Sequence, residues 1–278
     1  MIHHAPEELG IVISDLFVQS INELLKAKTN NTDIEMLLLN VITEFARKWP
    51  NVAGYASVKY NRQALIQHLL DNIENSSKLL LVRKSDGALS KLAITFTKEN
   101  FELLLNHKDL SLLRYVRNNI QSEDEHGLKN LRNGVLTMAN VAKVHNPELR
   151  PWVREITCIV VEVINFHKDK DTHIELETEI IESAITTLTF LLRGYSSEMV
   201  EFMEKGTLET FIEECLNFDL EGMMNYVCEE MEAEDEYEME DEYFNEDTVC
   251  WKVRAAILRY ITTLMHKDKV FKDNKAKQ

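Results

Sequence analysis

The sequence predicts an all-α protein in which pairs of helices stack in a row. Glycine and proline are scarce, at 8 and 4 among 278 residues, which favours long helices with few tight turns. Apolar residues recur at helical spacing along most of the chain, and the alternation typical of β-strands is hard to find. The third observation is that a two-helix pattern returns several times along the sequence.

The first predicted pair occupies the beginning of the chain. Asn30 and Asn31 end its first helix. The second helix starts at Thr32, where Glu35 three residues later gives a capping-box pattern, and Pro50 ends it because proline cannot continue the hydrogen-bond ladder. The predicted apolar face of the first helix is Ile13, Leu16, Phe17, Ile21 and Leu24. The predicted apolar face of the second is Ile34, Leu38, Val41 and Phe45.

The same pattern predicts four further pairs. The second pair has apolar faces at Leu65, Leu69 and Ile73, then at Val82, Leu89, Leu92 and Phe96. The third has Phe101, Leu104 and Leu105, then Leu128, Leu131, Val135 and Met138. The fourth is a helix from Pro151 to Phe166, a polar turn over 167–173, and a partner with Ile181, Ile185, Leu188 and Leu192. The fifth is a helix over 199–216 and, beyond an acidic segment, one with Val253, Ile257, Tyr260 and Leu264.

The spacing of the second helices indicates the type of repeat. They are predicted to begin near Asp33, Lys78, Asp124, Glu175 and Asp247. The first three steps, of 45, 46 and 51 residues, match or slightly exceed the HEAT or armadillo period of ~40–47 residues. The last step is longer because the acidic segment is inserted there. We therefore expect a HEAT-repeat α-solenoid of about five helix pairs with an acidic loop inserted in the last pair. The solenoid is expected over 7–228, the acidic flexible loop over 229–247, and the second helix of the last repeat with a basic tail over 248–278.

Charge and motif content narrow the function classes. The net charge is −16, but 12 acidic residues lie between Glu229 and Asp247 with no basic one, so the remainder carries about −4. The sequence contains no cluster of basic residues that would predict nucleic-acid binding. No apolar run reaches the ~18 residues of a membrane span, and no signal peptide is recognisable. Neither a metal nor a cofactor motif is found, and the known catalytic motifs are missing, so we expect no enzyme activity. Four cysteines without CxxC spacing favour a reducing compartment.

Two features suggest where a partner binds. A Val-Arg pair lies near the start of two of the second helices, as Val82-Arg83 and Val253-Arg254. The valine is expected to pack inward and the arginine to reach along the stack. The acidic loop is either a solvated linker or an arm that attracts a basic partner surface. The candidate protein-binding residues on second helices are Arg83, Lys84, Arg193, Lys252 and Arg254. Those in the acidic loop are Glu234, Asp235, Glu236, Tyr237, Asp241, Glu242 and Tyr243.

The segment before and after the acidic loop resembles a known family. A predicted helix ends in Cys215-Leu216, an acidic run with tyrosines follows, and the chain resumes with Trp251-Lys252-Val253-Arg254-Ala255-Ala256. This order resembles the amino-terminal HEAT-repeat region of the cullin-associated and neddylation-dissociated (CAND) proteins, which have Ser-Trp-Lys-Val-Arg at the same point. Here Cys250 stands in place of that serine. The stretch 80–105 is similar to an earlier repeat of the same region.

The resemblance implies a role in the ubiquitin system. CAND proteins bind unneddylated cullin with its RING subunit and promote assembly and exchange in SCF-type ligases, so we expect a monomeric scaffold of cytoplasm and nucleus that contacts cullin. The family's long carboxy-terminal part has no counterpart in this sequence, so we expect it not to drive receptor exchange by itself. The alternatives are an importin-β-like nuclear-transport receptor and another HEAT scaffold, such as a phosphatase regulatory subunit.

Overall fold

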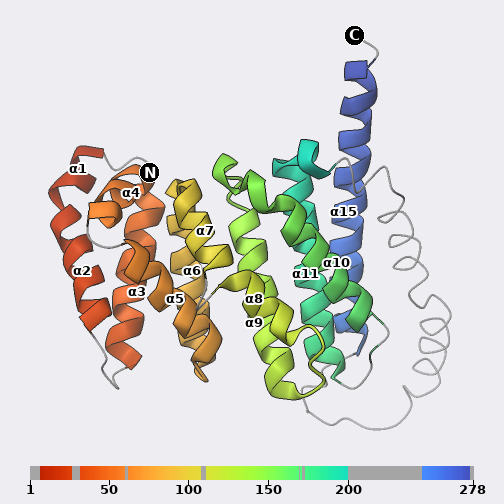
Figure 1. Cartoon of the computed structure of the whole chain (residues 1–278), viewed down its shortest axis with the longest axis horizontal. Helices are drawn as coiled ribbons and strands as arrows, with labels where there is room; N and C mark the ends of the chain where they lie inside the picture. The colour runs from red at the N-terminus through yellow and green to blue at the C-terminus, as the bar shows by residue number, and fades with distance from the viewer. Residues whose placement is uncertain are drawn as a thin grey trace, which may run out of the picture.

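The computed structural model describes residues 7–26, 32–59, 62–107, 111–168, 170, 173–199 and 246–275. Within these ranges the chain is helical and contains no strand, so the all-α prediction is confirmed there. The helices follow one another in a row from α1 at one end to α15 at the other (Figure 1). Except for Met199, the helix predicted over 199–216 lies outside the described residues, as does the acidic loop up to Asn245.

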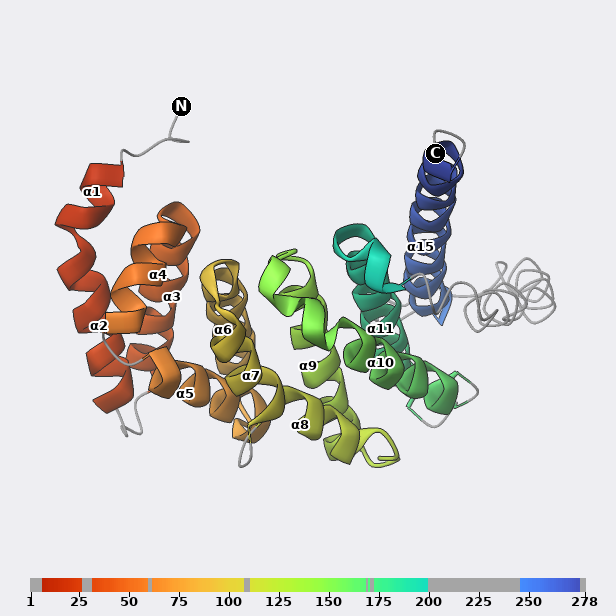
Figure 2. The same cartoon turned by 45° about the horizontal axis from the view of Figure 1, so that its top comes forward.

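The helices form two layers along this row (Figure 2). One layer consists of α3 (Thr32–Lys48), α6 (Leu79–Leu92), α9 (Glu125–Ala142), α11 (Ile174–Gly194) and α15 (Glu246–Lys275). The other contains α5 (Arg62–Asn75), α7 (Lys98–Asn106), α8 (Leu112–Asn119) and α10 (Val153–His167). Helix α2 (Ser14–Lys26) lies at the α1 end of the row and packs on α3. Shorter elements are α1 (Glu7–Val12), α4 (Pro50–Lys59) and the 3₁₀ segments η1 (Ala93–Thr95) and η2 (Pro147–Trp152). Each helix of the first layer packs against the next one in that layer, as stacked helix pairs require.

The starts of the second helices were predicted to within one residue. α3, α6, α9, α11 and α15 begin at 32, 79, 125, 174 and 246, against expected starts at 33, 78, 124, 175 and 247. Asp124 shows why one boundary is sharp, because its Oδ1 accepts hydrogen bonds from the main-chain N–H groups of His126 at 3.1 Å and Gly127 at 3.0 Å. Residues 246 and 247, which were expected to close the acidic loop, already belong to α15.

Several elements differ from the sequence prediction. Helix α4 begins at Pro50 and is absent from the sequence prediction, in which this proline only ends α3. Proline is equally suited to the first turn of a new helix. Helix α8 was also missed. The helix predicted from Pro151 begins instead as the 3₁₀ segment η2, and its α-helical part starts at Val153.

The buried face of α3 is rotated relative to the prediction. Leu39 and Ile42 are fully buried, whereas Ile34 and Val41 are 47% and 45% exposed. The stretch 36–42 contains six apolar residues in seven, so helical periodicity alone fits more than one face. In the same way Leu16 of α2, predicted inside, is exposed, and its neighbour Val18 is buried.

Buried polar side chains connect the pairs. Glu35, predicted to close a capping box, accepts a 2.8 Å hydrogen bond from Asn72 Nδ2 of α5, which also donates to Ser85 Oγ of α6 at 3.1 Å. Asn146, between α9 and η2, donates to the main-chain oxygens of Ala93 and Phe96, both at 2.9 Å. These bonds fix the register between successive pairs, because each buried polar group has its partner on another helix or turn.

Candidate functional site

A small groove lies on the layer of second helices, where α6, α9 and α11 meet. Its volume is about 170 Å³. This is below the ~300–1,000 Å³ of a typical small-molecule or cofactor site. The residues that determine its chemistry are Leu79, Val82, Arg83, Asp86, Arg132, Leu136, Glu179 and Glu182. We call this site the α6–α9–α11 groove.

The spacing of these residues explains why they meet. On α6 the groove residues stand at 79, 82, 83 and 86, and on α11 at 179, 182 and 183, which are the i, i+3 and i+4 positions of one helix face. Helix α9 lies between them and contributes 132, 133, 136 and 137. Each of these three helices therefore turns one face toward the core and a neighbouring face toward the groove.

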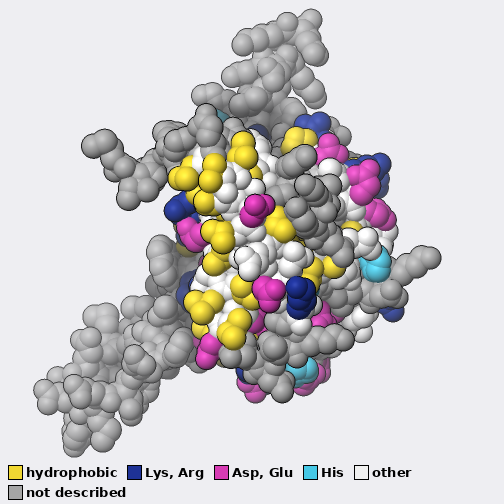
Figure 3. Space-filling model, turned by 90° about the vertical axis from the view of Figure 1, so that its left-hand side faces the viewer, with side chains coloured by type: hydrophobic (Ala, Val, Ile, Leu, Met, Phe, Trp, Pro, Cys, Tyr) yellow, Lys and Arg dark blue, Asp and Glu magenta, His cyan; other side chains and the backbone are white. Residues whose placement is uncertain are grey.

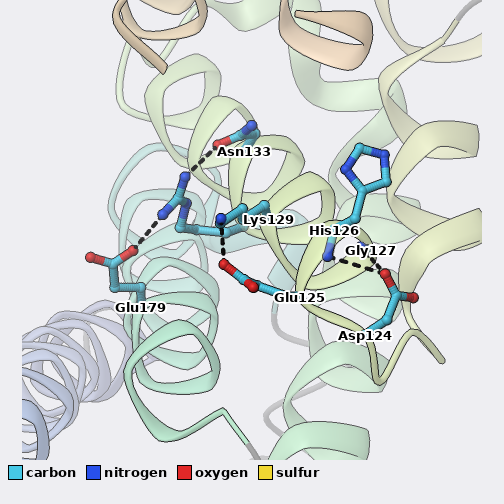
Figure 4. Close-up of polar contacts among 8 residues, drawn as sticks. Asp124, Glu125, His126, Gly127, Lys129, Asn133 and Glu179 are labelled. Atoms are coloured by element: carbon cyan, nitrogen blue, oxygen red, sulfur yellow. Dashed lines mark hydrogen bonds and ion pairs between the residues drawn. The ribbon is translucent and has the colours of Figure 1, made fainter. Parts of the chain in front are cut away.

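An ion pair crosses the groove from α9 to α11. Arg132 Nη1 lies 3.1 Å from Glu179 Oε2, and its Nη2 donates to Asn133 Oδ1 at 3.2 Å. Figure 4 shows Asn133 and Glu179 on either side of this contact, with the Lys129–Glu125 pair beside it. The Arg132 side chain is only 15% exposed. Its positive charge is therefore already neutralised within the protein.

Asp86 is the most buried acidic residue of the groove. Its Oδ2 accepts a 2.6 Å hydrogen bond from Asn140 Nδ2 of α9, but its buried Oδ1 has no hydrogen-bond partner among the described residues. Burial raises the pKa of Asp86 to about 6, and the polar groups of Thr137 and Asn140 partly oppose that rise. At pH 7 the carboxyl group is therefore largely ionised, although Asp86 is only 8% exposed.

The structure places the predicted basic residues along the layer rather than in one cluster. Arg83 lines the groove and is exposed, whereas the half-buried Lys84 does not line it. Arg193, near the end of α11, donates from Nε to Thr263 Oγ1 of α15 at 3.3 Å. Lys252 is exposed near the start of α15. Among the described residues, no hydrogen bond or ion pair joins these side chains to one another.

The rest of the predicted site falls outside what the structure describes. Arg254 belongs to α15, but its side chain is not among those described. The acidic-loop residues are also outside the described ranges, namely Glu234, Asp235, Glu236, Tyr237, Asp241, Glu242 and Tyr243. Both valines of the Val-Arg pairs behave as expected, since Val82 and Val253 are buried.

Sequence reasoning missed the acidic half of the groove. Asp86 follows Arg83-Lys84-Ser85 in a polar stretch that is typical of a solvated helix face, yet Ser85 and Asp86 are both buried. Arg132 and Glu179 lie 47 residues apart, close to the repeat period. That separation is the one signal that would have nominated them as neighbours on adjacent second helices.

A second surface of interest is the α1 end of the row. Figure 3 shows apolar side chains gathered on this end of the molecule. The large exposed apolar residues of α1 to α3 are Leu9, Ile11, Val12, Leu16, Ile34, Leu37 and Val41. Exposed apolar surfaces of this kind are typical of protein-contact sites.

Neither a metal cluster nor a membrane-spanning helix is present in the described ranges. No group of three or more His, Cys, Asp or Glu side chains there is arranged to hold a metal ion. No described helix is long and apolar enough to cross a bilayer. Comparisons of the chain with models of known protein families, with curated proteins and with solved structures found no match.

Proposed function

We propose that this chain is a HEAT-repeat scaffold that binds another protein. Support comes from the stacked helix pairs, in which α3, α6, α9 and α11 begin at near-regular intervals, from the small groove across three of those helices, and from the apolar α1 end. Repeat proteins of this kind use extended surfaces formed by successive repeats to hold their partners. A groove of about 170 Å³ suits a partner's side chain better than a cofactor.

The partner we propose is an unneddylated cullin with its RING subunit. One observation carries this choice: the Trp251-Lys252-Val253-Arg254 sequence, through which the chain resembles the CAND family, lies in the first turns of α15. Helix α15 packs on α11 and extends the layer of second helices, and Val253 is buried in the core. This is the position that the sequence has in a second helix of a HEAT repeat. The assembly role in SCF-type ligases follows from the resemblance.

A direct binding measurement tests the proposal. Purified full chain is passed over an immobilised cullin–RING complex, either unmodified or conjugated to the ubiquitin-like modifier. We expect saturable binding to the unmodified complex and much weaker binding to the conjugate. Equal binding to both, or binding to neither, would rule out the cullin assignment. Saturable binding to a GTP-loaded Ran-type GTPase instead would favour the importin-β-like alternative.

A charge reversal locates the contact on the chain. Lys252→Glu, on the layer of second helices, is expected to weaken cullin binding. Lys26→Glu on α2, at the opposite end of the row from α15, makes the same change of charge at another exposed lysine and is the matched control. Equal effects of the two variants would mean that net charge, and not the second-helix surface, governs binding.

A further inference from the structure

The α6–α9–α11 groove holds a buried carboxylate that forms no ion pair with any residue that the structure describes. No described residue donates a hydrogen bond to the buried Asp86 Oδ1, and Oδ2 accepts a 2.6 Å bond from the amide of Asn140. Both polar groups that lower the pKa of this carboxyl, those of Asn140 and Thr137, are neutral. An ionised carboxylate buried without a positive partner is costly, because desolvation is not repaid by attraction. The arrangement therefore favours a ligand that brings a positive charge and hydrogen-bond donors.

The groove's own arginines do not supply that charge. Arg132 is engaged with Glu179 and Asn133. Arg83 is exposed and makes no hydrogen bond or ion pair with another described residue. Glu182, half-buried on α11, also has no ion pair within the described ranges. With Asp86 ionised, the groove carries three carboxylates against two guanidinium groups, so its net charge favours a cationic ligand.

The remaining walls of the groove are apolar. Leu79 and Leu136 are 43% and 37% exposed, and the buried Val82 also lines the groove. Lysine and arginine side chains pack a hydrocarbon stem against such surfaces while the charged end reaches polar groups. An apolar wall leading to carboxylates therefore matches the two halves of a long basic side chain, and the volume of about 170 Å³ admits a single side chain and excludes a larger group.

We propose that the α6–α9–α11 groove receives a lysine or arginine side chain of a bound polypeptide, with Asp86 and Glu182 holding its charged end. The proposal deepens the proposed function by naming the chemistry that the scaffold recognises. The proposal rests on the proposed function only in that the ligand is a protein. It does not depend on whether that protein is a cullin.

A short peptide probes the groove without any assumption about the natural partner. The probe is acetyl-Gly-Lys-Gly-amide, and acetyl-Gly-norleucine-Gly-amide is its uncharged counterpart of similar shape. Binding to the full chain is followed by NMR through the side-chain amide of Asn140, which is bonded to Asp86. We expect the lysine peptide to bind in the millimolar range and to shift this resonance, and the norleucine peptide to bind at least about tenfold more weakly.

Four variants separate the contribution of the groove from general charge effects. Asp86→Asn and Glu182→Gln should each weaken binding of the lysine peptide by about tenfold. Arg83→Gln should strengthen it a few-fold, because a like charge at the groove is removed. Glu162→Gln, on the exposed face of α10, makes the same charge change away from the groove and should leave binding unaltered.

The proposal fails if the norleucine peptide, or the acidic acetyl-Gly-Glu-Gly-amide, binds as tightly as the lysine peptide. It also fails if Asp86→Asn and Glu182→Gln bind the lysine peptide like the unaltered chain while both remain folded by circular dichroism. Either result would leave the cullin measurement untouched. Conversely, a chain that binds the lysine peptide through Asp86 but does not bind cullin would support the groove and exclude that partner.

Discussion

Asn140 Nδ2 donates a 2.6 Å hydrogen bond to Asp86 Oδ2, and this bond joins α9 to α6 across 54 residues of sequence. It links two successive second helices at the floor of the α6–α9–α11 groove. The neutral asparagine satisfies one carboxylate oxygen but does not compensate the negative charge. Burial therefore raises the pKa of Asp86 to about 6. The residue is therefore suited to a ligand at the expense of stability.

Asp86→Asn should stabilise the protein at neutral pH. The folded-state pKa of Asp86 lies above its ordinary value of 3.8, so the native state binds the proton more tightly and its stability falls as pH rises from about 4 to above 6. The neutral asparagine avoids this loss and can still accept the bond from Asn140. At ~1.4 kcal/mol per pKa unit, we expect the free energy of unfolding at pH 7.5 to increase by up to about 3 kcal/mol.

Urea denaturation of both proteins between pH 4 and pH 8 measures this difference. The advantage of Asp86→Asn should grow with pH and nearly vanish at pH 4. A difference that stays constant over this range would mean that burial of the ionised carboxylate is not its cause.

His167 should give the opposite dependence on pH. The residue is 1% exposed, Nε2 lies 2.9 Å from the main-chain oxygen of Ile120, and Nδ1 has no hydrogen-bond partner among the described residues. Burial lowers the pKa of His167 below 6.5, an effect that the bond to Ile120 partly opposes. The native state therefore resists protonation, and the stability due to the neutral ring is lost as pH falls below 6.5.

A His167→Gln variant isolates that contribution, because glutamine keeps a donor and does not titrate. We expect the variant to be less stable than the parent at pH 7.5, and the difference in unfolding free energy to shrink by pH 5. Chemical denaturation at several pH values tests this. A gap that widens on acidification would contradict the assignment.

Arg62 should be among the most sensitive positions for stability. It is 4% exposed, and its guanidinium donates to the main-chain oxygens of Gly54 at 2.6 Å and Thr95 at 3.0 Å and to Asn100 Oδ1 at 2.8 Å. Arg62→Ala leaves these acceptors unsatisfied, so we expect a loss of about 3 kcal/mol or more in the free energy of unfolding.

Arg62→Lys is the informative companion to the alanine variant. It keeps the charge but replaces the planar fork with a single ammonium group, which cannot reach all three acceptors in the same geometry. Its stability should fall between those of the parent and Arg62→Ala. If Arg62→Lys unfolded at the same temperature as the parent, the positive charge and not the planar guanidinium geometry would hold α4, η1 and α7 together.

Two glycines should respond oppositely to the same substitution. A Cβ on Gly134 of α9 would lie 2.6 Å from Val116 Cγ2, in a fully buried contact with α8, so Gly134→Ala is expected to destabilise by roughly 1–3 kcal/mol. A Cβ on Gly87 of α6 would meet no atom within 4 Å. Gly87→Ala should therefore stabilise by about 1 kcal/mol through helix propensity alone. Differential scanning calorimetry of the two variants measures both effects, and equal signs would contradict this explanation.

The helix pairs were predictable because their signals are local. Asp124 caps α9 directly before its first helical residue, and the starts of α3, α6, α9 and α11 are 46 to 49 residues apart. The face that each helix buries was less predictable. The apolar stretch 36–42 in α3 allows more than one buried face, and whether Leu38 or Leu39 is buried depends on the neighbouring helices. Helix α8 has only eight residues, too few for a clear period.

The groove was harder to predict than the fold. Arg83 was nominated from a local sequence pair, and it does line the groove. Asp86 was not, because a carboxylate among polar neighbours gives no local sign of being buried. Its environment comes from Asn140 of the next pair, a contact that depends on how far α9 is displaced along α6. Such displacements are set by packing across the whole interface, which no short pattern encodes.

The junction between α6 and α9 has a mechanical consequence. These helices touch over fewer residues than α3 and α6 or α9 and α11 do, and the Asp86–Asn140 bond is one of the contacts across the junction. In an array where each unit contacts only its neighbours, bending concentrates at the joint with the least packing. We therefore expect the row to be most compliant there, and a side chain inserted between Asp86 and Glu182 to stiffen the row at its softest joint.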